Sequence, residues 1–240
     1  VKRSIQHVVV DEVQDYAPMQ LYILTKTFPR ARFTFVGDVF QSLNPYVWQT
    51  ENNLEAIFAA LHPKTVRLTK SYRSTEEIFR FCDGLLGKRI PAETVLRHGR
   101  RPSISHITKA RRIESVRDRI MGRLGDNHET IAVICETVQE CQEIYDGLRG
   151  LDPSLPLSLL IEERAKFEAG VIIVPVFLAK GLEFDAVIIP EANSEVYGEE
   201  YQRRILYVAC SRALHSLNLL YTGRLSPFIE DLPSELYSLE

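Results

Sequence analysis

Two adjacent carboxylates, Asp11 and Glu12, follow directly after the apolar run at residues 8–10. If that run is a buried strand, both carboxylates lie at its carboxyl end, where α/β proteins bind their ligands. An aspartate in this place can hold Mg²⁺, and a neighbouring glutamate can activate or orient the water that attacks a phosphoryl group. Taken alone, the pair is equally typical of an acidic turn that caps a helix beginning at Pro18.

A second apolar run, residues 33–36, ends in Gly37-Asp38, and Gln41 follows three residues later. A neutral amide in this place could sense the terminal phosphate of a nucleotide. Taken alone, an ordinary turn is the simpler interpretation, because Gly37 would supply a permissive backbone and Asp38 would cap the residues after it.

Short β-branched runs alternate with segments whose apolar residues recur at helix spacing, which predicts parallel βαβ units and an α/β fold with helices flanking a central sheet. We expect strands at residues 8–10, 33–36, 65–68, 131–135, 171–174, 187–189 and 217–221, and helices at residues 18–27, 53–61, 75–86, 111–124, 138–149 and 202–213. An irregular stretch at residues 87–102 is expected to be a surface connection.

Five segments in a fixed order resemble the motifs of the Rep/UvrD-type superfamily 1 helicases. The second and third motifs of that family have the forms D-E-x-Q-D and G-D-x-x-Q-S, which match residues 11–15 and 37–42. Residues 68–74 resemble the fourth motif, residues 174–185 the fifth and residues 203–213 the sixth. The resemblance covers the whole chain except its tail.

This resemblance implies a role in ATP hydrolysis for several side chains. Asp11 would hold Mg²⁺ and Glu12 would activate the attacking water. The other three catalytic residues, which would read the γ-phosphate, are Gln41, Arg73 and Arg212.

The nucleoside and the DNA would contact other residues. In the family, the fourth-motif tyrosine stacks on adenine and the fifth-motif glutamate contacts the ribose, which here are Tyr72 and Glu183, with Gly181 beside the bound nucleotide. Tyr46 and Trp48 are candidates for stacking on single-stranded bases, at about 1–3 kcal/mol per base. Packing of these two aromatics under a loop is an equally good interpretation.

The resemblance also implies a RecA-like P-loop NTPase fold. Residues 1–65 would form the C-terminal part of the first lobe, with motifs two and three, and residues 66–240 a complete second lobe. ATP bound between the lobes would close them, and its hydrolysis would drive movement on single-stranded or duplex DNA. The tail after residue 225 is expected to be a terminal extension.

Two departures from the family pattern matter. No G-x-x-x-x-G-K-[ST] segment occurs, and this phosphate-binding loop is expected upstream, so the isolated chain should not turn over ATP. In the fifth motif, Pro175 and Phe177 replace the usual threonine and histidine. This form is closer to the HelD-like branch, whose members include ATPases that act on bacterial RNA polymerase.

Composition sets further limits. The net charge of -3 gives no evidence of a polyanionic partner. No apolar run is long enough to span a bilayer, and the four cysteines lack zinc-site spacing, so we expect buried thiols in a cytoplasmic protein. We also expect a monomer. The basic cluster Lys109, Arg111, Arg112, Arg117 and Arg119 could track a phosphate backbone, although a solvated helix face is the simpler interpretation. A protein-docking module with a vestigial nucleotide apparatus, and a stand-alone DNA-binding lobe, remain alternative functions.

Overall fold

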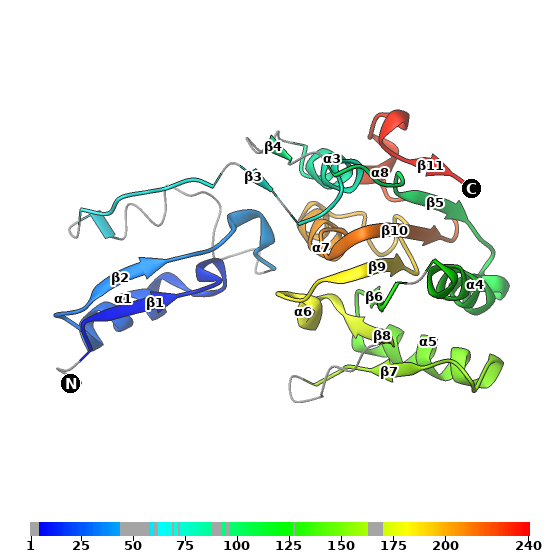
Figure 1. Ribbon diagram of the computed structural model, residues 1–240, viewed down its shortest axis with the longest axis horizontal. Helices are drawn as coiled ribbons and strands as arrows, with labels where there is room; N and C mark the ends of the chain where they lie inside the picture. Colours follow the sequence, from blue (N-terminus) through cyan, green and yellow to red (C-terminus); the bar gives the residue numbers. More distant parts are fainter. Residues whose placement is uncertain are drawn as a thin grey trace. The chain divides into compact units, whose positions relative to one another are not determined.

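The computed structural model describes residues 5–43, 58–59, 62–68, 70–71, 73–87, 93–94, 97–126, 128–162 and 170–240. The chain divides into two compact units, Val1–Arg67 and Leu68–Glu240 (Figure 1). Most of the helix expected at residues 53–61 lies outside the described residues.

The first unit contains a βαβ arrangement. Strand β1 (His7–Val10) pairs in parallel with β2 (Arg32–Phe35), and helix α1 (Pro18–Thr27) connects them. The helix begins at a proline, whose missing N–H is not needed in the first turn. Two short 3₁₀ helices, η1 (Val13–Asp15) and η2 (Val39–Gln41), follow the carboxyl ends of the two strands.

The second unit is built on a seven-stranded sheet in the order β11-β5-β10-β9-β6-β8-β7, in which every pairing is parallel. This confirms the α/β fold with a parallel sheet flanked by helices. The strands are β5 (Ser103–His106), β6 (Thr130–Cys135), β7 (Leu157–Leu159), β8 (Gly170–Pro175), β9 (Phe184–Ile189), β10 (Ala213–Tyr221) and β11 (Ser238–Leu239). A separate parallel pair joins β3 (Lys70–Ser71) to β4 (Glu93–Thr94).

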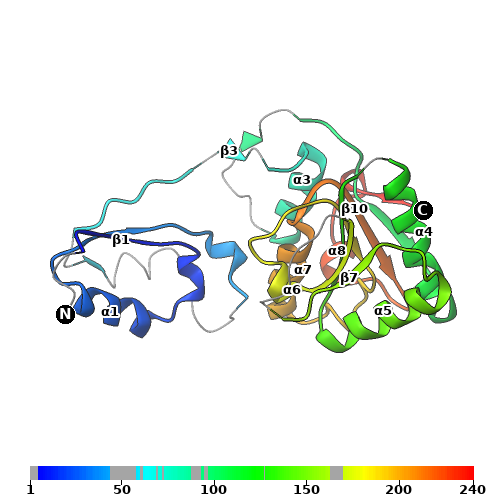
Figure 2. The same cartoon turned by 60° about the horizontal axis from the view of Figure 1, so that its bottom comes forward.

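Helices cover both faces of this sheet (Figures 1 and 2). The connections through α4 (Arg112–Gly125) and α5 (Val138–Leu151) run across the sheet in one direction, and those through α6 (Val176–Ala179) and α7 (Glu200–Cys210) run in the other. Because parallel crossovers are right-handed, the two pairs lie on opposite faces. Helix α3 (Glu76–Leu85) packs against α7 and β10.

The central strands are buried on both faces, as their continuous apolar runs predict. Ile131, Val133, Val171, Ile173 and Ile188 belong to one core cluster under α4 and α5. All four cysteines are buried and free. Burial raises the pKa of the Cys82 thiol to about 12, so this thiol stays protonated and unreactive.

Two expectations about local structure are wrong. Residues 65–68 form no strand, and Val66 and Leu68 are 81% and 88% exposed. The helix expected at 202–213 ends at Cys210, and β10 begins at Ala213. The last residues of the helix and the first residues of the strand are both apolar, and only two residues separate them. No glycine or proline marks the boundary.

The tail after residue 225 is part of the second unit. Helix α8 (Pro227–Glu230) buries Phe228 and Ile229, and η5 (Ser234–Leu236) leads into β11. Strand β11 pairs with β5 through Ser238 and Ser103. The expectation of a terminal extension is therefore wrong, because the tail supplies an edge strand and core side chains.

Candidate nucleotide-binding site

The first unit places its carboxylates where the sequence predicts, at the carboxyl ends of neighbouring parallel strands. Asp11 and Glu12 follow β1, and Asp38 lies beyond the end of β2. Glu12 has a φ of 49°, in the left-handed region. Such a backbone costs a non-glycine residue about 1–3 kcal/mol and is typical of functional sites.

A buried glutamine joins the two motifs of this unit. The Gln14 side chain is fully buried, donates from Nε2 to Glu12 Oε2, and accepts at Oε1 from the Asp38 backbone N–H at 3.1 Å. Asp38 Oδ2 in turn accepts from Gln41 Nε2 at 2.9 Å. One chain of hydrogen bonds therefore links Glu12 to Gln41. The sequence marks Gln14 as a site residue only by its amide two residues after Glu12, which predicts no role by itself.

Only glycine fits at position 37, because the neighbouring residues leave no room for a Cβ atom. A Cβ atom at this position would lie 2.2 Å from Gln14 Oε1 and 2.9 Å from Val13 Cγ1. Its φ is not among the positive values found for the glycines of the described residues. The turn interpretation, in which Gly37 supplies a permissive backbone, is thus replaced by one in which the two motifs pack too closely for any side chain.

The second unit brings its predicted residues to the amino ends of β9 and β10. Glu183 immediately precedes β9, and Arg212 immediately precedes β10. The Phe184 N–H donates to the Arg212 carbonyl at 3.0 Å, and the Thr75 N–H donates to the Leu214 carbonyl at 3.2 Å. Because Thr75 lies two residues after Arg73, this second bond ties the segment that carries Arg73 to the same edge.

Arg73 and Glu183 form an ion pair, with Nε 2.6 Å from Oε1. Gly181, two residues before Glu183, has a φ of 78°, and nothing lies within 4 Å of the position of a Cβ atom. The loop therefore uses a backbone conformation that favours glycine and leaves open space beside it.

Arg212 is fully buried. Its Nε donates to the Val208 carbonyl at 3.1 Å, one terminal nitrogen donates to the Leu182 carbonyl at 3.4 Å, and the other donates to Ser211 Oγ at 3.1 Å. The guanidinium therefore joins the end of α7 to the loop between α6 and β9.

The predicted site residues fall into two groups. Asp11, Glu12 and Gln41 belong to the first unit, whereas the residues of the second unit are Arg73, Gly181, Glu183 and Arg212. The remaining predictions, Tyr46, Trp48 and Tyr72, lie outside the described residues.

Asp11 is suited to hold Mg²⁺. Its side chain is exposed, one carboxylate oxygen accepts the Glu12 N–H at 2.8 Å, and hard oxygen ligands are those that Mg²⁺ prefers. Within the described ranges, no three histidine, cysteine, aspartate or glutamate side chains are grouped as a metal site. A single carboxylate suffices for Mg²⁺ when waters and substrate phosphates complete its coordination.

Asp185 fixes the amino end of β9, two residues after Glu183. Its Oδ2 accepts from the N–H groups of Glu129 and Thr130 at 2.9 and 3.0 Å, and from Thr130 Oγ1 at 3.1 Å. Burial raises the pKa of this carboxyl. The hydrogen bonds and the nearby His215 lower it by a larger amount, so the pKa lies below its ordinary value.

Asp185→Asn is expected to lower the free energy of unfolding by about 1–3 kcal/mol at neutral pH, because an amide nitrogen or a neutral oxygen then faces three donors. Since the folded-state pKa is depressed, the stabilisation is present above the unfolded-state pKa and is lost as pH falls through the folded-state value. Denaturant melts should show the difference from wild type shrinking below about pH 4. Exposed Asp231→Asn is the control, and an equal loss in both variants would contradict this account.

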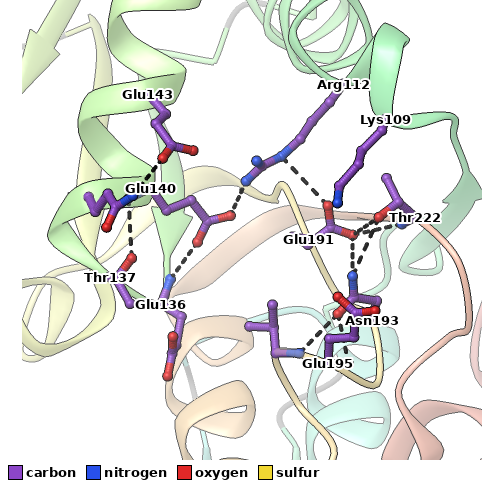
Figure 3. Close-up of a pocket in the computed structure, with 12 residues that line it drawn as sticks. Lys109, Arg112, Glu136, Thr137, Glu140, Glu143, Glu191, Asn193, Glu195 and Thr222 are labelled. Atoms are coloured by element: carbon purple, nitrogen blue, oxygen red, sulfur yellow. Dashed lines mark hydrogen bonds and ion pairs between the residues drawn. The ribbon is translucent and has the colours of Figure 1, made fainter.

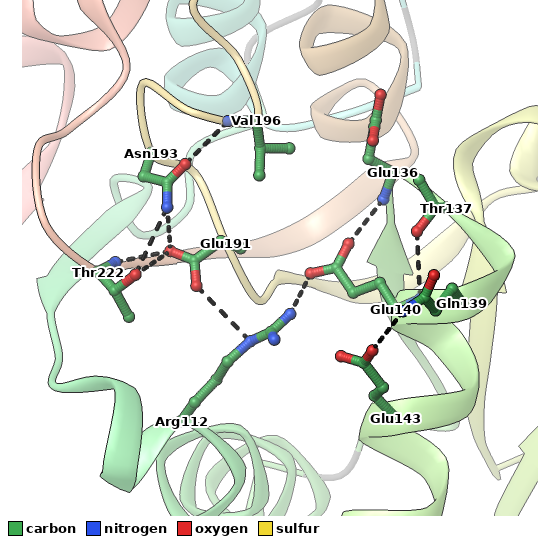
Figure 4. A network of polar contacts seen from close by, with 10 residues as sticks. All are labelled: Arg112, Glu136, Thr137, Gln139, Glu140, Glu143, Glu191, Asn193, Val196 and Thr222. Carbon is green, nitrogen blue, oxygen red and sulfur yellow. Dashed lines mark hydrogen bonds and ion pairs between the residues drawn. The ribbon is translucent and has the colours of Figure 1, made fainter.

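A polar cavity of about 330 Å³ lies at the opposite, carboxyl edge of the same sheet (Figure 3). Glu136, Glu191 and Thr222 line it and follow the carboxyl ends of β6, β9 and β10. Glu191 Oε1 accepts from the Thr222 N–H at 2.7 Å, from Thr222 Oγ1 at 2.9 Å and from Asn193 Nδ2 at 2.8 Å (Figure 4).

Arg112 joins three elements around this cavity. Its guanidinium pairs with Glu140 on α5 and, at 3.6 Å, with Glu191 beyond β9 (Figure 4). Burial raises the pKa of Glu140, and the charge of Arg112 partly offsets that effect. The interpretation of the basic cluster as a solvated helix face is therefore wrong for Arg112, whose side chain is only 20% exposed.

Arg112→Met is expected to lower the free energy of unfolding by about 3–5 kcal/mol, because it leaves two buried carboxylates without their cation. Arg111→Met is the matched control, since that neighbouring side chain is 68% exposed and its loss should cost less than about 0.5 kcal/mol. Chemical denaturation measures both variants. Equal stability of the two would show that the network does not hold α4, α5 and β9 together.

The second unit is a parallel sheet covered by helices on both faces, which is the architecture of a RecA-like lobe. Residues 170–223, which contain Gly181, Glu183 and Arg212, match the sequence profile of the UvrD-like helicase C-terminal domain.

The fold is also similar to a solved structure, the C-terminal domain of a possible DNA helicase from Lactobacillus plantarum WCFS1. The two chains are 35% identical, with a TM-score of 0.61, and the match covers 70% of this chain and 98% of that one. No curated protein matches the chain in sequence. The chain belongs to the UvrD-like superfamily 1 helicases, as a C-terminal part. None of the described helices combines the length and apolar character needed to cross a membrane.

Proposed function

We propose that this chain is the C-terminal part of the motor core of an ATP-dependent DNA helicase or translocase. The observation that carries the proposal is the gathering of Arg73, Glu183 and Arg212 at the amino ends of β9 and β10. Both arginines bring a permanent positive charge, and the planar fork of Arg73 matches phosphate oxygens, whereas the terminal nitrogens of buried Arg212 donate to Leu182 and Ser211. Membership of the helicase family supports the same function.

In the proposed site, residues of the first unit act on the attacking water. Asp11 would hold Mg²⁺ through its carboxylate oxygens, and the ion would neutralise phosphate charge when ATP is bound. Glu12 would orient the water and accept its proton, while its bond from Gln14 keeps the carboxylate in place. Gln41, at the far end of the same hydrogen-bond chain, would contact the γ-phosphate.

Arg73 and Arg212 would contribute positive charge to the γ-phosphate from the second unit, and Tyr72 and Glu183 would hold the nucleoside. Two RecA-like lobes, residues 1–65 and residues 66–240, would then close on ATP and separate after hydrolysis. Alternation between these states would move the protein along DNA. The chain has no phosphate-binding G-x-x-x-x-G-K-[ST] loop, so we expect it to be inactive in isolation.

The test is a strand-displacement assay with the natural full-length protein, ATP, Mg²⁺ and a forked DNA duplex that carries a fluorophore and a quencher. A helicase displaces the labelled strand with ATP and not with a non-hydrolysable analogue. A translocase that does not unwind would still remove streptavidin from biotinylated single-stranded DNA. Failure of both reactions by a folded, ATP-hydrolysing protein would rule out movement on DNA.

A second candidate function is remodelling of RNA polymerase, as in the HelD-like branch. The observation in its favour is the end of β8, where Pro175 ends the strand and Phe177 on α6 is 50% exposed. Neither side chain can donate a hydrogen bond to a DNA phosphate. ATPase activity that RNA polymerase stimulates and DNA does not would favour this candidate. Under either function we expect a cytoplasmic monomer.

A further inference from the structure

The contacts of Arg73 suggest a specific task for Glu183. The carboxylate contacts Nε of the guanidinium at 2.6 Å. Nε lies on the side of the guanidinium group and not at the end formed by its two terminal nitrogens. Those nitrogens form the fork that binds phosphate oxygens in pairs. The contact therefore orients Arg73 without occupying its phosphate-binding end.

The backbones of both residues are anchored close to the pair. On one side, the Thr75 N–H bonds to the Leu214 carbonyl. On the other, the Phe184 N–H bonds to the Arg212 carbonyl, and Asp185 is held by Glu129 and Thr130. Both anchors use the amino end of β10, so the two side chains start from fixed points on one edge. A long arginine side chain on a fixed backbone still has many rotamers, and one carboxylate contact removes most of them.

We propose that Glu183 is a positioning residue, which holds the Arg73 guanidinium in the orientation that receives the γ-phosphate. The inference rests on the proposed function. It differs from the role that the family resemblance gives this glutamate, because a ribose contact serves ATP and ADP equally, whereas orientation of Arg73 serves only a nucleotide that has a γ-phosphate.

The size of the effect is limited by exposure. The two side chains are 38% and 40% exposed, and ion pairs in this range contribute little to stability by themselves. We therefore expect Glu183→Ala to leave the melting temperature unchanged and to weaken binding of a non-hydrolysable ATP analogue about fivefold. ADP affinity should stay within twofold of wild type, which is roughly the deviation from additivity seen for mutations at independent sites.

The experiment is a double-mutant cycle in the natural full-length protein. Fluorescent-nucleotide titrations would give the affinities for the ATP analogue and for ADP in wild type, Glu183→Ala, Arg73→Ala and the double variant. In the Arg73→Ala background, Glu183→Ala should have no further effect on either nucleotide. Glu183→Gln, which keeps an oxygen for Nε–H, should retain part of the discrimination. Glu200→Ala is the control, because that glutamate is 79% exposed and pairs with Arg203.

Two results would overturn the inference. In the first, Glu183→Ala weakens binding of the ATP analogue and binding of ADP by the same factor, and does so again in the Arg73→Ala background. Glu183 would then be a nucleoside contact, and the proposed function would stand. If the wild-type protein bound neither nucleotide, the proposed function itself would fail together with the inference.

Discussion

Arg212→Ala in the natural full-length protein is expected to lower the rate of ATP hydrolysis by about 10³-fold or more, the range measured when an arginine that stabilises a phosphoryl transition state is removed. The same change should also reduce stability. Arg212 is fully buried and donates to the carbonyls of Val208 and Leu182, and buried acceptors that lose a charged donor cost about 1–3 kcal/mol each.

Arg212→Lys separates the two effects. Lysine keeps the positive charge but cannot donate from a planar fork to Val208, Leu182 and Ser211 together. We expect it to recover part of the stability, measured by denaturant unfolding, and little of the hydrolysis rate, measured under saturating ATP. Full activity in a folded Arg212→Lys or Arg212→Ala protein would show that this buried arginine has only a structural role.

Glu12→Gln is expected to lower the hydrolysis rate by about 10²–10⁴-fold, because the amide cannot accept a proton from the attacking water. ATP binding should be retained, since the substituted side chain keeps an oxygen for the hydrogen bond from Gln14. Single-turnover hydrolysis measures the rate, and titration with labelled ATP measures the affinity.

The matched control for this substitution is Glu235→Gln in the exposed η5 segment, which should leave both quantities unchanged. A Glu12→Gln protein that hydrolyses ATP at the wild-type rate would remove Glu12 from the chemistry. The motif at residues 11–15 would then be an acidic turn, the interpretation that the residues alone left open.

The strands that the sequence predicted correctly share one physical property. Strands β6, β8 and β9 are covered by helices on both faces, so each is a continuous apolar run that stands out between polar helical segments. Helix α1 was predicted with its observed bounds because a proline begins it and its apolar residues recur at helix spacing.

The missed strand β5 has the opposite character. Ser103 and Ser105 are buried polar residues, and their hydroxyl groups accept hydrogen bonds from Asn218 Nδ2 and Arg119, each at 2.7 Å. A strand that satisfies its polar side chains through partners far along the chain has the local sequence of a loop. Strand β11, only two residues long, has too little pattern for any prediction.

The candidate site, like the fold, could be predicted only in part from the sequence. The residue types that could act on a phosphate are visible in the motifs, and the structure gathers Arg73, Glu183 and Arg212 at one edge of the second unit. The burial of Gln14 and the ion pair between Arg73 and Glu183 could not be predicted, because they depend on packing between segments distant in sequence.

The most direct test of the central claim, that this chain belongs to an ATP-driven motor that moves on DNA, is the steady-state ATPase rate of the natural full-length protein with and without single-stranded DNA. We predict hydrolysis that DNA stimulates strongly and that Glu12→Gln abolishes with DNA present. Absence of hydrolysis under both conditions, in a protein shown to be folded, would contradict the claim.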